Sequence, residues 1–237
     1  MFGITPQERS GASIVAGTAI GASMLSLPFI SGVAGFVPAS LMMVACYLFA
    51  IATLLLVLEM TLYCKDSDAN IISMAHMHLG KTGEYLTWFC FLFLLYIIST
   101  SYISGGGELL QSLLEPVIEL DTYTCMTVFT VVFGLVAFRG VSLLDQLNQI
   151  LLMALIISYF ALIGTIGPYT QVAYLSGGQP MFLISSIPIS IAAFASHFVV
   201  PSLRKNFSND TASLQRMLWI GSTIPLVIYL VYQYLIV

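Results

Sequence analysis

Long runs without a charged residue alternate with short polar segments along this chain. The uncharged runs cover residues 10–58, 85–107, 122–138, 146–203 and 217–237. A membrane-spanning helix needs about 20 consecutive, mostly apolar residues. Runs 10–58 and 146–203 are therefore long enough for two helices each, and the pattern predicts an all-α protein with about seven transmembrane helices.

The composition places the protein in a lipid bilayer. Hydrophobic residues make up 59% of the chain and charged residues only 8%, whereas a soluble domain averages roughly 25% charged residues. The chain carries no basic stripe, so we expect no nucleic-acid partner. It also lacks the motifs of metalloproteases, hydrolases and phosphate-binding loops, so we expect no enzyme, metal site or cofactor.

The positive charges all fall on one side of the predicted membrane topology. They lie before the first run or in every second connection, as Arg9, Lys65, Lys81, Arg139, Arg204, Lys205 and Arg216. The connection at residues 108–121, on the other side, carries only acidic charges. Because positively charged loops stay in the cytoplasm, this bias predicts a cytoplasmic N-terminus.

One cytoplasmic connection has a helical pattern of its own. Residues 71–82, IISMAHMHLGKT, place Ile and Met against His and Lys at helical spacing, which predicts a helix lying on the membrane surface. His76 and His78 are two residues apart, whereas a helical metal site needs a spacing of four. We interpret both histidines as the solvated face of that helix.

The first span contains residues that weaken a helix. Its stretch GTAIGASMLSLP, residues 17–28, holds two glycines, three hydroxyl residues and a proline. One interpretation is a break near Ala19–Ala22, whose exposed helix end would suit a carboxylate. The alternative is close packing of another helix against Gly17 and Gly21.

The sixth span, IPISIAAFASHFVVPSL, has similar features. Pro188 and Pro201 are predicted to interrupt it, and His197 lies between them among small residues. A histidine within a span marks a functional site by default. The alternative is a neutral histidine that hydrogen-bonds a neighbouring helix.

The two weakened spans are five helices apart. Transporters built from an inverted repeat break corresponding helices of the two halves, and bind substrate near the midplane at the breaks. A first span that starts in the cytoplasm and a sixth that starts outside have the opposite orientations that such a repeat requires.

Two motifs carry a resemblance to a known family. IGASMLSLP in the first span resembles the first-helix signature of amino acid/polyamine/organocation transporters. Together with VAGTAIGASMLSLP, the FASHFVVPSL of the sixth span is similar to the hydroxy/aromatic amino acid permeases, and among them to the tyrosine-specific permeases of bacteria. The likeness extends from about Ser10 to the end of the chain.

The resemblance implies a proton-coupled importer of an aromatic amino acid, most of all tyrosine, in the bacterial inner membrane. It implies a LeuT-like fold of about eleven spans, with residues 10–165 as the first repeat and residues 166–237 as the start of the second, all within one transmembrane domain, 1–237. The implied substrate-binding residues are Ala19, Ile20, Gly21, Ala22, Ser23, Ala193, Phe194, Ala195 and Ser196, with His197 beside them. Ser23 and Ala195 stand where the family often has glycine.

Three further candidates come from their positions in the spans. Tyr96 and Ser99 lie near the middle of the third span, where they could reach a substrate or pack between helices. Glu59 is the acidic residue at the cytoplasmic end of the second span, and either titrates or pairs with Lys65. His197 and Glu59 are the candidates for proton coupling.

Seven spans fall short of two five-helix repeats, so we expect a C-terminal part to be missing and this piece not to transport. The alternatives are a non-transporting fragment, a scaffold subunit, or a seven-helix receptor or photosensor. Against a photosensor, no lysine lies within a span to carry retinal.

Overall fold

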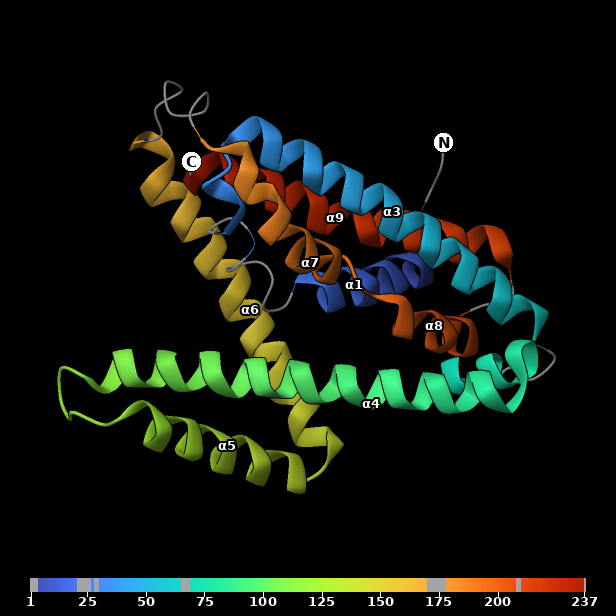
Figure 1. The fold of residues 1–237 in the computed structure, drawn as a ribbon, viewed down its shortest axis with the longest axis horizontal. Coiled ribbons are helices and arrows are strands. Elements are labelled where there is room, and N and C mark those ends of the chain that lie inside the picture. Colours follow the sequence, from blue (N-terminus) through green and yellow to red (C-terminus); the bar gives the residue numbers. More distant parts are fainter. Residues whose placement is uncertain are drawn as a thin grey trace. The chain divides into compact units, whose positions relative to one another are not determined.

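The computed structural model describes residues 4–20, 27, 30–64, 69–169, 178–207 and 210–236 (Figure 1). These ranges contain helices and connecting turns, without a strand. The chain divides into two compact units: Met1–Gly80 with Phe160–Val237, and Lys81–Tyr159.

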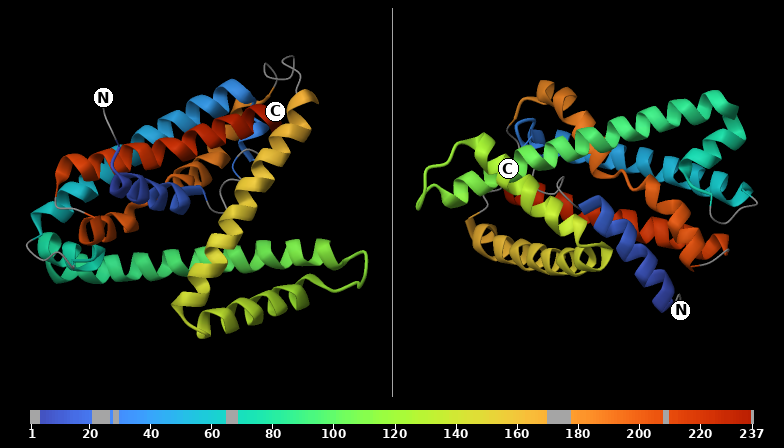
Figure 2. Two further views of the ribbon diagram at one scale, coloured as in Figure 1. Left: turned by 180° about the vertical axis from the view of Figure 1, so that it is seen from behind. Right: turned by 90° about the horizontal axis from the view of Figure 1, so that it is seen from below.

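The first unit is a bundle built from segments far apart in the sequence. Helix α9 (Thr211–Ile236) packs against α1 (Pro6–Ile20) and α3 (Phe36–Tyr63). Helices α7 (Leu183–Ala193) and α8 (Val200–Phe207) pack against α3. In Figure 2 the red α9 lies alongside the blue α1 and α3, so the last described helix packs against helices from the N-terminal part of the chain.

An apolar cluster holds these helices together. Its buried members come from α1, α3, the short helix η4 (His197–Val199), α8 and α9: Val15, Ile51, Leu54, Leu58, Val199, Val200, Leu203, Leu214, Met217 and Leu218. Burying such a side chain stabilises a protein in water by about 1.5–3 kcal/mol. In lipid the same contacts act through close packing instead.

Helices α1 and α9 approach each other closely at two glycines. A Cβ atom added to Gly221 would lie 2.7 Å from the carbonyl oxygen of Ala12, and one added to Gly11 would lie 2.4 Å from the sulfur of Met217. Gly17 has no such neighbour within 4 Å among the described atoms outside its own helix. The predicted packing contact at Gly17 is therefore absent from the described residues, and Gly21 lies outside them.

The connections at one end of this unit also meet through a glycine. Gly178 has φ +120°, and a Cβ atom there would lie 2.4 Å from the backbone nitrogen of Gly35. The neighbouring Gln179 donates its N–H to the carbonyl of Val33 at 3.0 Å. The turn between the first two spans is thereby joined to the segment that precedes span six.

The second unit contains most of α4 (Ile71–Leu114), α5 (Thr122–Phe138) and the first part of α6 (Val141–Ile166). Asp121 caps α5 by accepting the Thr124 N–H at 3.1 Å. The hydrogen bond from the Thr124 hydroxyl to this exposed carboxylate, together with that N–H, lowers the pKa of Asp121.

Helix α4 has a kink that separates two predicted elements. Gly80 has φ 68° and ψ −163°, which is not helical, so residues 71–79 form a helix distinct from the long one that follows. The predicted helix in residues 71–82 is confirmed, although it ends earlier than expected. Its placement on the membrane surface stays a prediction.

Each of the predicted runs corresponds to helical segments of the described chain. By length and hydropathy, four of these segments are candidate membrane spans: Phe36–Tyr63, Ile71–Leu114, Leu183–Phe207 and Thr211–Leu235. Thr122–Phe138 and Met153–Ile166 are shorter apolar helices. The protein is a multi-pass membrane protein, and the count of seven spans remains a prediction.

Candidate functional site

The sixth span is interrupted near its middle. Helix α7 ends at Ala193, and the N–H groups of Phe194 and Ala195 bond to carbonyls three residues back, at 3.3 and 3.1 Å. Phe194 (φ −103°, ψ 5°) and Ser196 (φ −118°, ψ 20°) depart from helical geometry before η4 begins at His197. The predicted break in span six is confirmed.

The prolines do not lie at the break, contrary to the sequence prediction. Pro188 is inside α7, which continues for five further residues to Ala193. Pro201 is the second residue of α8. A proline is tolerated in the first turn of a helix because the N–H that it lacks would be unpaired there anyway. The interruption falls between the two prolines, at residues 194–196.

The first span is described through Ile20, so the first two residues of the predicted break at Ala19–Ala22 are helical. Ala19 and Ile20 are buried at the end of the described part of α1. The candidates Gly21, Ala22 and Ser23 lie outside the described residues. The break in span one therefore stays a prediction.

Tyr229 of α9 joins the ends of α1 and α7. Its side chain is fully buried, and its hydroxyl lies 2.6 Å from the carbonyl oxygen of Ala19 and 3.3 Å from that of Ala193. The phenol proton is donated mainly to Ala19, the nearer oxygen. One side chain thus brings together backbone groups of the two spans that the sequence singled out.

Phe194 is enclosed by two tyrosines rather than facing lipid. Its ring makes edge contacts with Tyr229, at 5.5 Å between centroids, and with Tyr47, at 6.0 Å. The Tyr47 hydroxyl in turn lies 2.9 Å from that of Thr223 on α9. By contrast, the Phe198 side chain is 48% exposed. Of these two phenylalanines, Phe194 is the one that is part of an aromatic cluster among the described residues.

The sequence did not single out Tyr229, although the spacing of polar residues in the last uncharged run indicates it. The last run contains Tyr229 and Gln233 four residues apart, hence on one face of a helix. Gln233 is also fully buried, where it accepts the Ser31 hydroxyl at 2.9 Å. Two polar side chains on one face of a membrane helix indicate that this face packs against other parts of the protein.

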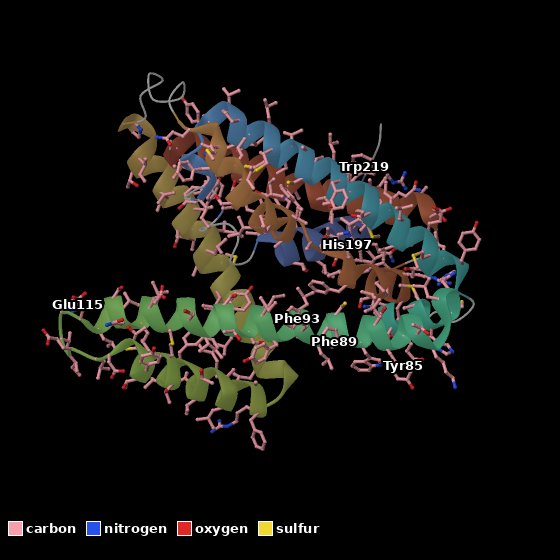
Figure 3. All side chains as sticks on the ribbon, viewed as in Figure 1. Tyr85, Phe89, Phe93, Glu115, His197 and Trp219 are labelled. Carbon is pink, nitrogen blue, oxygen red and sulfur yellow. The ribbon has the colours of Figure 1, made fainter. Side chains whose placement is uncertain are left out.

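His197 lies at the start of η4 and contacts α3 (Figure 3). Its Nε2 is 2.8 Å from the hydroxyl of Thr53. That hydroxyl also lies 3.0 Å from the carbonyl oxygens of Phe49 and Ala50, to either of which it can donate. A hydroxyl has one proton, so Nε2 donates to Thr53 in the tautomer that carries its proton there, and accepts the hydroxyl in the other tautomer. This hydrogen bond to a neighbouring helix is what the packing alternative for His197 predicts.

Ala195 and Ser196 complete the interrupted segment. Ala195 is half-buried, whereas Ser196 is buried and its hydroxyl has no hydrogen-bond partner among the described residues. A buried polar group without a partner is costly and calls for an explanation. The interruption therefore offers both a backbone carbonyl and a side-chain hydroxyl.

The remaining candidates lie apart from this segment. Glu59 is exposed on α3, and Lys65, its predicted partner, lies outside the described residues. Tyr96 lines a hollow of about 430 Å³ on α4 together with Thr100, Ser101 and Ser104. Ser99 is exposed on the same helix but does not line that hollow. Tyr96 and Ser99 belong to the second unit, so their approach to a ligand stays a prediction.

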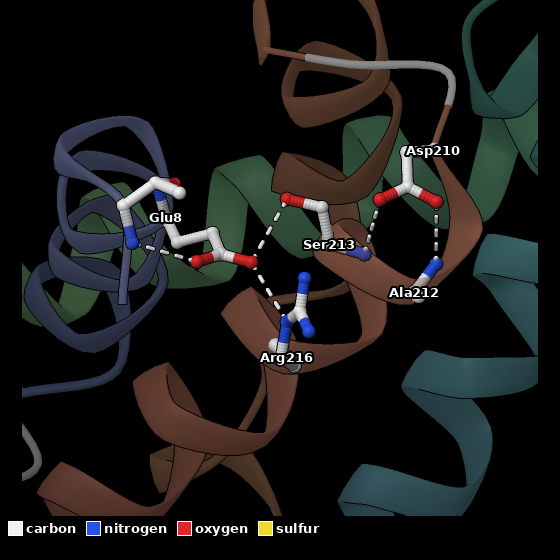
Figure 4. A network of polar contacts seen from close by, with 6 residues as sticks. Glu8, Asp210, Ala212, Ser213 and Arg216 are labelled. Atoms are coloured by element: carbon white, nitrogen blue, oxygen red, sulfur yellow. Dashed lines mark hydrogen bonds and ion pairs between the residues drawn. The ribbon is translucent and has the colours of Figure 1, made fainter. Parts of the chain in front are cut away.

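A buried acid fixes the start of α1, as Figure 4 shows. In the sequence TPQE, Glu8 accepts the Thr5 N–H at 2.8 Å while Thr5 accepts the Glu8 N–H at 3.2 Å, which forms a capping box. The Glu8 carboxylate also accepts hydrogen bonds from Arg216 Nε at 2.7 Å and from the Ser213 hydroxyl at 3.2 Å, and both donors are on α9. This network ties α1 to α9 at the end opposite Tyr229.

The surroundings of Glu8 stabilise its charged form. Glu8 precedes the uncharged run that starts at Ser10, so it lies outside the predicted span. The Thr5 N–H and then the Arg216 side chain hold the pKa of Glu8 below its ordinary value of 4.5, against the opposing effect of burial. Glu8 was missed in the sequence, although Thr5, Pro6 and Glu8 match a helix-start signature.

Comparison with known proteins gives a family match over almost the whole chain. Residues 5–237 match the model of the tryptophan/tyrosine permease family. The chain is 30% identical to the tyrosine-specific transport system 1 of Haemophilus influenzae over 93% of its own length and 55% of that protein. It is 28% identical to a tryptophan-specific transport protein of Pseudomonas aeruginosa, over 97% of the chain and 58% of that protein.

A relative with a different named substrate matches at the same identity. The glutamine transporter 2 of Aliivibrio fischeri is 30% identical over 95% of the chain and 59% of that protein. The chain thus spans somewhat more than half the length of these relatives. No solved structure matches the chain.

Proposed function

The chain belongs to the tryptophan/tyrosine permease family, and on that premise we propose that it forms the substrate-binding part of a secondary transporter for an aromatic amino acid. The observation that carries the proposal is the interruption of span six beside the end of α1. Non-helical backbone at membrane depth is tolerated where it is buried in protein or lines a polar cavity. An amino acid offers such backbone groups a charged partner.

The ammonium group of the substrate would bind carbonyl oxygens at the two helix ends. Ala19 and Ala193 present such oxygens, which Tyr229 brings together. Ser196 adds a buried hydroxyl that lacks a partner among the described groups. An ammonium has three donors and requires acceptors of this kind.

The other roles rest on the family resemblance. Ile20, Gly21, Ala22 and Ser23 would hold the carboxylate, and Phe194 and Ala195 would face the side chain. Tyr96 and Ser99 would approach from the third span. His197 or Glu59 would carry the coupled proton, with His197 favoured by its position at the interruption.

The intact arrangement that we propose is a LeuT-like inverted repeat in a bacterial cytoplasmic membrane, with the N-terminus in the cytoplasm. Residues 10–165 would form the first repeat and residues 166–237 the start of the second. The confirmed break in span six and the predicted break in span one occupy the corresponding positions that this fold requires.

Tyrosine is the substrate we favour, because two tyrosine-specific relatives match at 30% identity. The aromatic surroundings of Phe194 suit a planar ring, since aromatic pairs gain about 0.5–1.5 kcal/mol beyond area burial. The glutamine transporter, which matches at the same identity, makes glutamine the necessary competitor in any test.

Binding and uptake test the proposal in turn. Labelled tyrosine is bound to the chain in lipid nanodiscs, with tryptophan, phenylalanine and glutamine as competitors. We expect binding that aromatic amino acids displace and glutamine does not. Uptake into proteoliposomes then follows, with and without a pH gradient. Uptake that persists after the gradient collapses would contradict proton symport.

The alternative is a non-transporting fragment or a membrane scaffold or receptor subunit. Absence of uptake does not separate these possibilities, because this piece is expected not to transport; binding of an amino acid separates them. If the chain binds tyrosine without moving it, the site assignment stands and transport by this chain does not. If it binds no amino acid and copurifies with a fixed partner, the scaffold alternative replaces the proposal.

A further inference from the structure

Tyr229 occupies the carbonyl groups that the proposed substrate would need. We propose that its hydroxyl stands in for the substrate's ammonium group in the empty protein and is displaced when an amino acid binds. This inference rests on the proposed function and adds a residue of the seventh span to its site. Tyr229 is in this account a positioning residue that competes with the ammonium group of the ligand for these two carbonyl oxygens.

The geometry favours a competitive role over simple packing. The hydroxyl lies 2.6 Å from the Ala19 oxygen and 3.3 Å from the Ala193 oxygen, in a fully buried position. In a continuous helix, each of these oxygens would accept the N–H four residues further on. At Ala193 the helix ends instead, so its oxygen is available to another donor.

In the predicted spans, both oxygens would lie at the depth where an inverted-repeat carrier binds its substrate. Ala19 follows the start of the uncharged run at Ser10 by about 14 Å, at about 1.5 Å per helical residue. Ala193 follows the start of α7 at Leu183 by about 15 Å. With the spans starting at these residues and a hydrocarbon core about 30 Å thick, both oxygens would lie near its midplane.

An ammonium group is the stronger partner for these oxygens. The phenol has a single proton, which serves one carbonyl well and the second poorly. An ammonium carries three protons and a charge, and charge-assisted hydrogen bonds are roughly twice as strong as neutral ones. A ligand with an ammonium group therefore displaces the hydroxyl, whereas a ligand without a charged donor does not.

Displacement would be transmitted to neighbouring helices through the ring. The Tyr229 ring contacts Phe194, which contacts Tyr47 of α3. Tyr47 meets Thr223, which is on the same helix as Tyr229. Movement of the hydroxyl away from Ala19 therefore changes the packing among α3, α7 and α9.

Tyr229→Phe tests the inference because it removes the hydroxyl and keeps the ring. The ligands are tyrosine, tyramine, which lacks the carboxylate, and 3-(4-hydroxyphenyl)propionate, which lacks the ammonium. Tyr234→Phe is the matched control, since Tyr234 is on the same helix with its ring against Phe36 and its side chain 39% exposed.

We expect Tyr229→Phe to tighten the binding of tyrosine and tyramine by about twofold to tenfold, which corresponds to one neutral hydrogen bond. The Kd of the propionate should not change, and Tyr234→Phe should change none of the three. Equal effects on all three ligands would indicate a merely structural role and overturn the inference. Weaker tyramine binding would also overturn it, because the hydroxyl would then support the ligand.

A second measurement keeps Tyr229 in place. With 3-fluorotyrosine at position 229, the ¹⁹F resonance should shift when tyramine saturates the protein and stay unchanged with the propionate. An unchanged resonance with bound tyramine would contradict displacement. If the unmodified chain binds none of the three ligands, the proposed function fails first. If tyrosine binds and the hydroxyl has no effect, only the inference fails.

Discussion

At the scale of single residues, hydrogen-bond partners distinguish alternatives that the sequence left open. His197 had two interpretations, as a functional group or as a histidine bonded to a neighbouring helix. Its contact with Thr53 on α3 supports the second, while its place at the interruption keeps the first as a proposal. Partners of this kind could not be read from the sequence, because Thr53 and His197 are 144 residues apart.

Thr53→Val should destabilise the protein by about 1–3 kcal/mol, because the His197 ring nitrogen loses its hydrogen-bond partner at a half-buried position. Thr53→Ser keeps a hydroxyl at that position and should lie near the original stability. Thermal unfolding in one detergent gives the comparison. Equal stability of the valine and serine variants would show that the hydrogen bond contributes nothing.

Glu8 should make the stability of the protein depend on pH. The pKa of its carboxyl is lowered in the folded state, chiefly by the Thr5 N–H. A lowered pKa stabilises the fold above the ordinary value of 4.5, and that contribution is lost as pH falls through the lower, folded value. Glu8→Gln should therefore unfold more easily than the original protein at pH 7, with the difference shrinking below about pH 4.5.

The matched control for that experiment is Glu119→Gln, at an exposed position outside the predicted spans. Its unfolding should follow the original protein across the pH range. A Glu8→Gln variant whose deficit stays constant from pH 7 to pH 3 would show that shape rather than charge accounts for the loss.

At the scale of elements, the sequence identified the helices better than their interruptions. Small and polar residues marked span six as weak, and it does break. The prolines pointed to the wrong positions: Pro201 lies in the first turn of α8, where its missing N–H is not needed, and α7 continues through Pro188 to Ala193. Tyr229 was missed because the period of one helix tells which residues share a face, not which neighbour that face meets.

Two glycines should respond in opposite ways to alanine. Gly221→Ala should cost about 1–3 kcal/mol, because its Cβ meets the Ala12 carbonyl at 2.7 Å and the helices must separate. Gly17→Ala should be neutral or stabilising by up to about 1 kcal/mol, since alanine favours a helix and the described surroundings leave space. Thermal unfolding in one detergent compares the stability of both variants with that of the original protein. A large loss at Gly17 would restore the packing interpretation of the first span.

At the scale of the whole molecule, the distribution of lysine and arginine predicts the orientation of the chain in the membrane. The interruptions of spans one and six predict where it binds a substrate. In the predicted topology, all seven lysines and arginines lie on one side, Arg9 before the first span and the others in connections. The orientation rests on this bias alone, because positively charged loops stay in the cytoplasm whatever the packing inside the protein. The LeuT-like repeat, in contrast, depends on contacts between distant segments, and remains a proposal.

Single cysteines test the orientation. In a background with Cys90 replaced by serine, Glu119→Cys should react with an impermeant maleimide on intact cells, and Lys81→Cys should react only after the cells are opened. Both side chains are exposed, so access depends on the side of the membrane. The reverse pattern would invert the topology.

The central claim is that the interrupted segment of span six and the end of α1 together hold an amino acid. Photolabelling with 4-azidophenylalanine tests it most directly, followed by mapping of the labelled peptides. We predict labelling of the peptide that contains residues 193–197, or of the one that contains residues 19–20, and its loss with excess tyrosine. Label confined to other segments, or label that tyrosine does not reduce, would contradict the account.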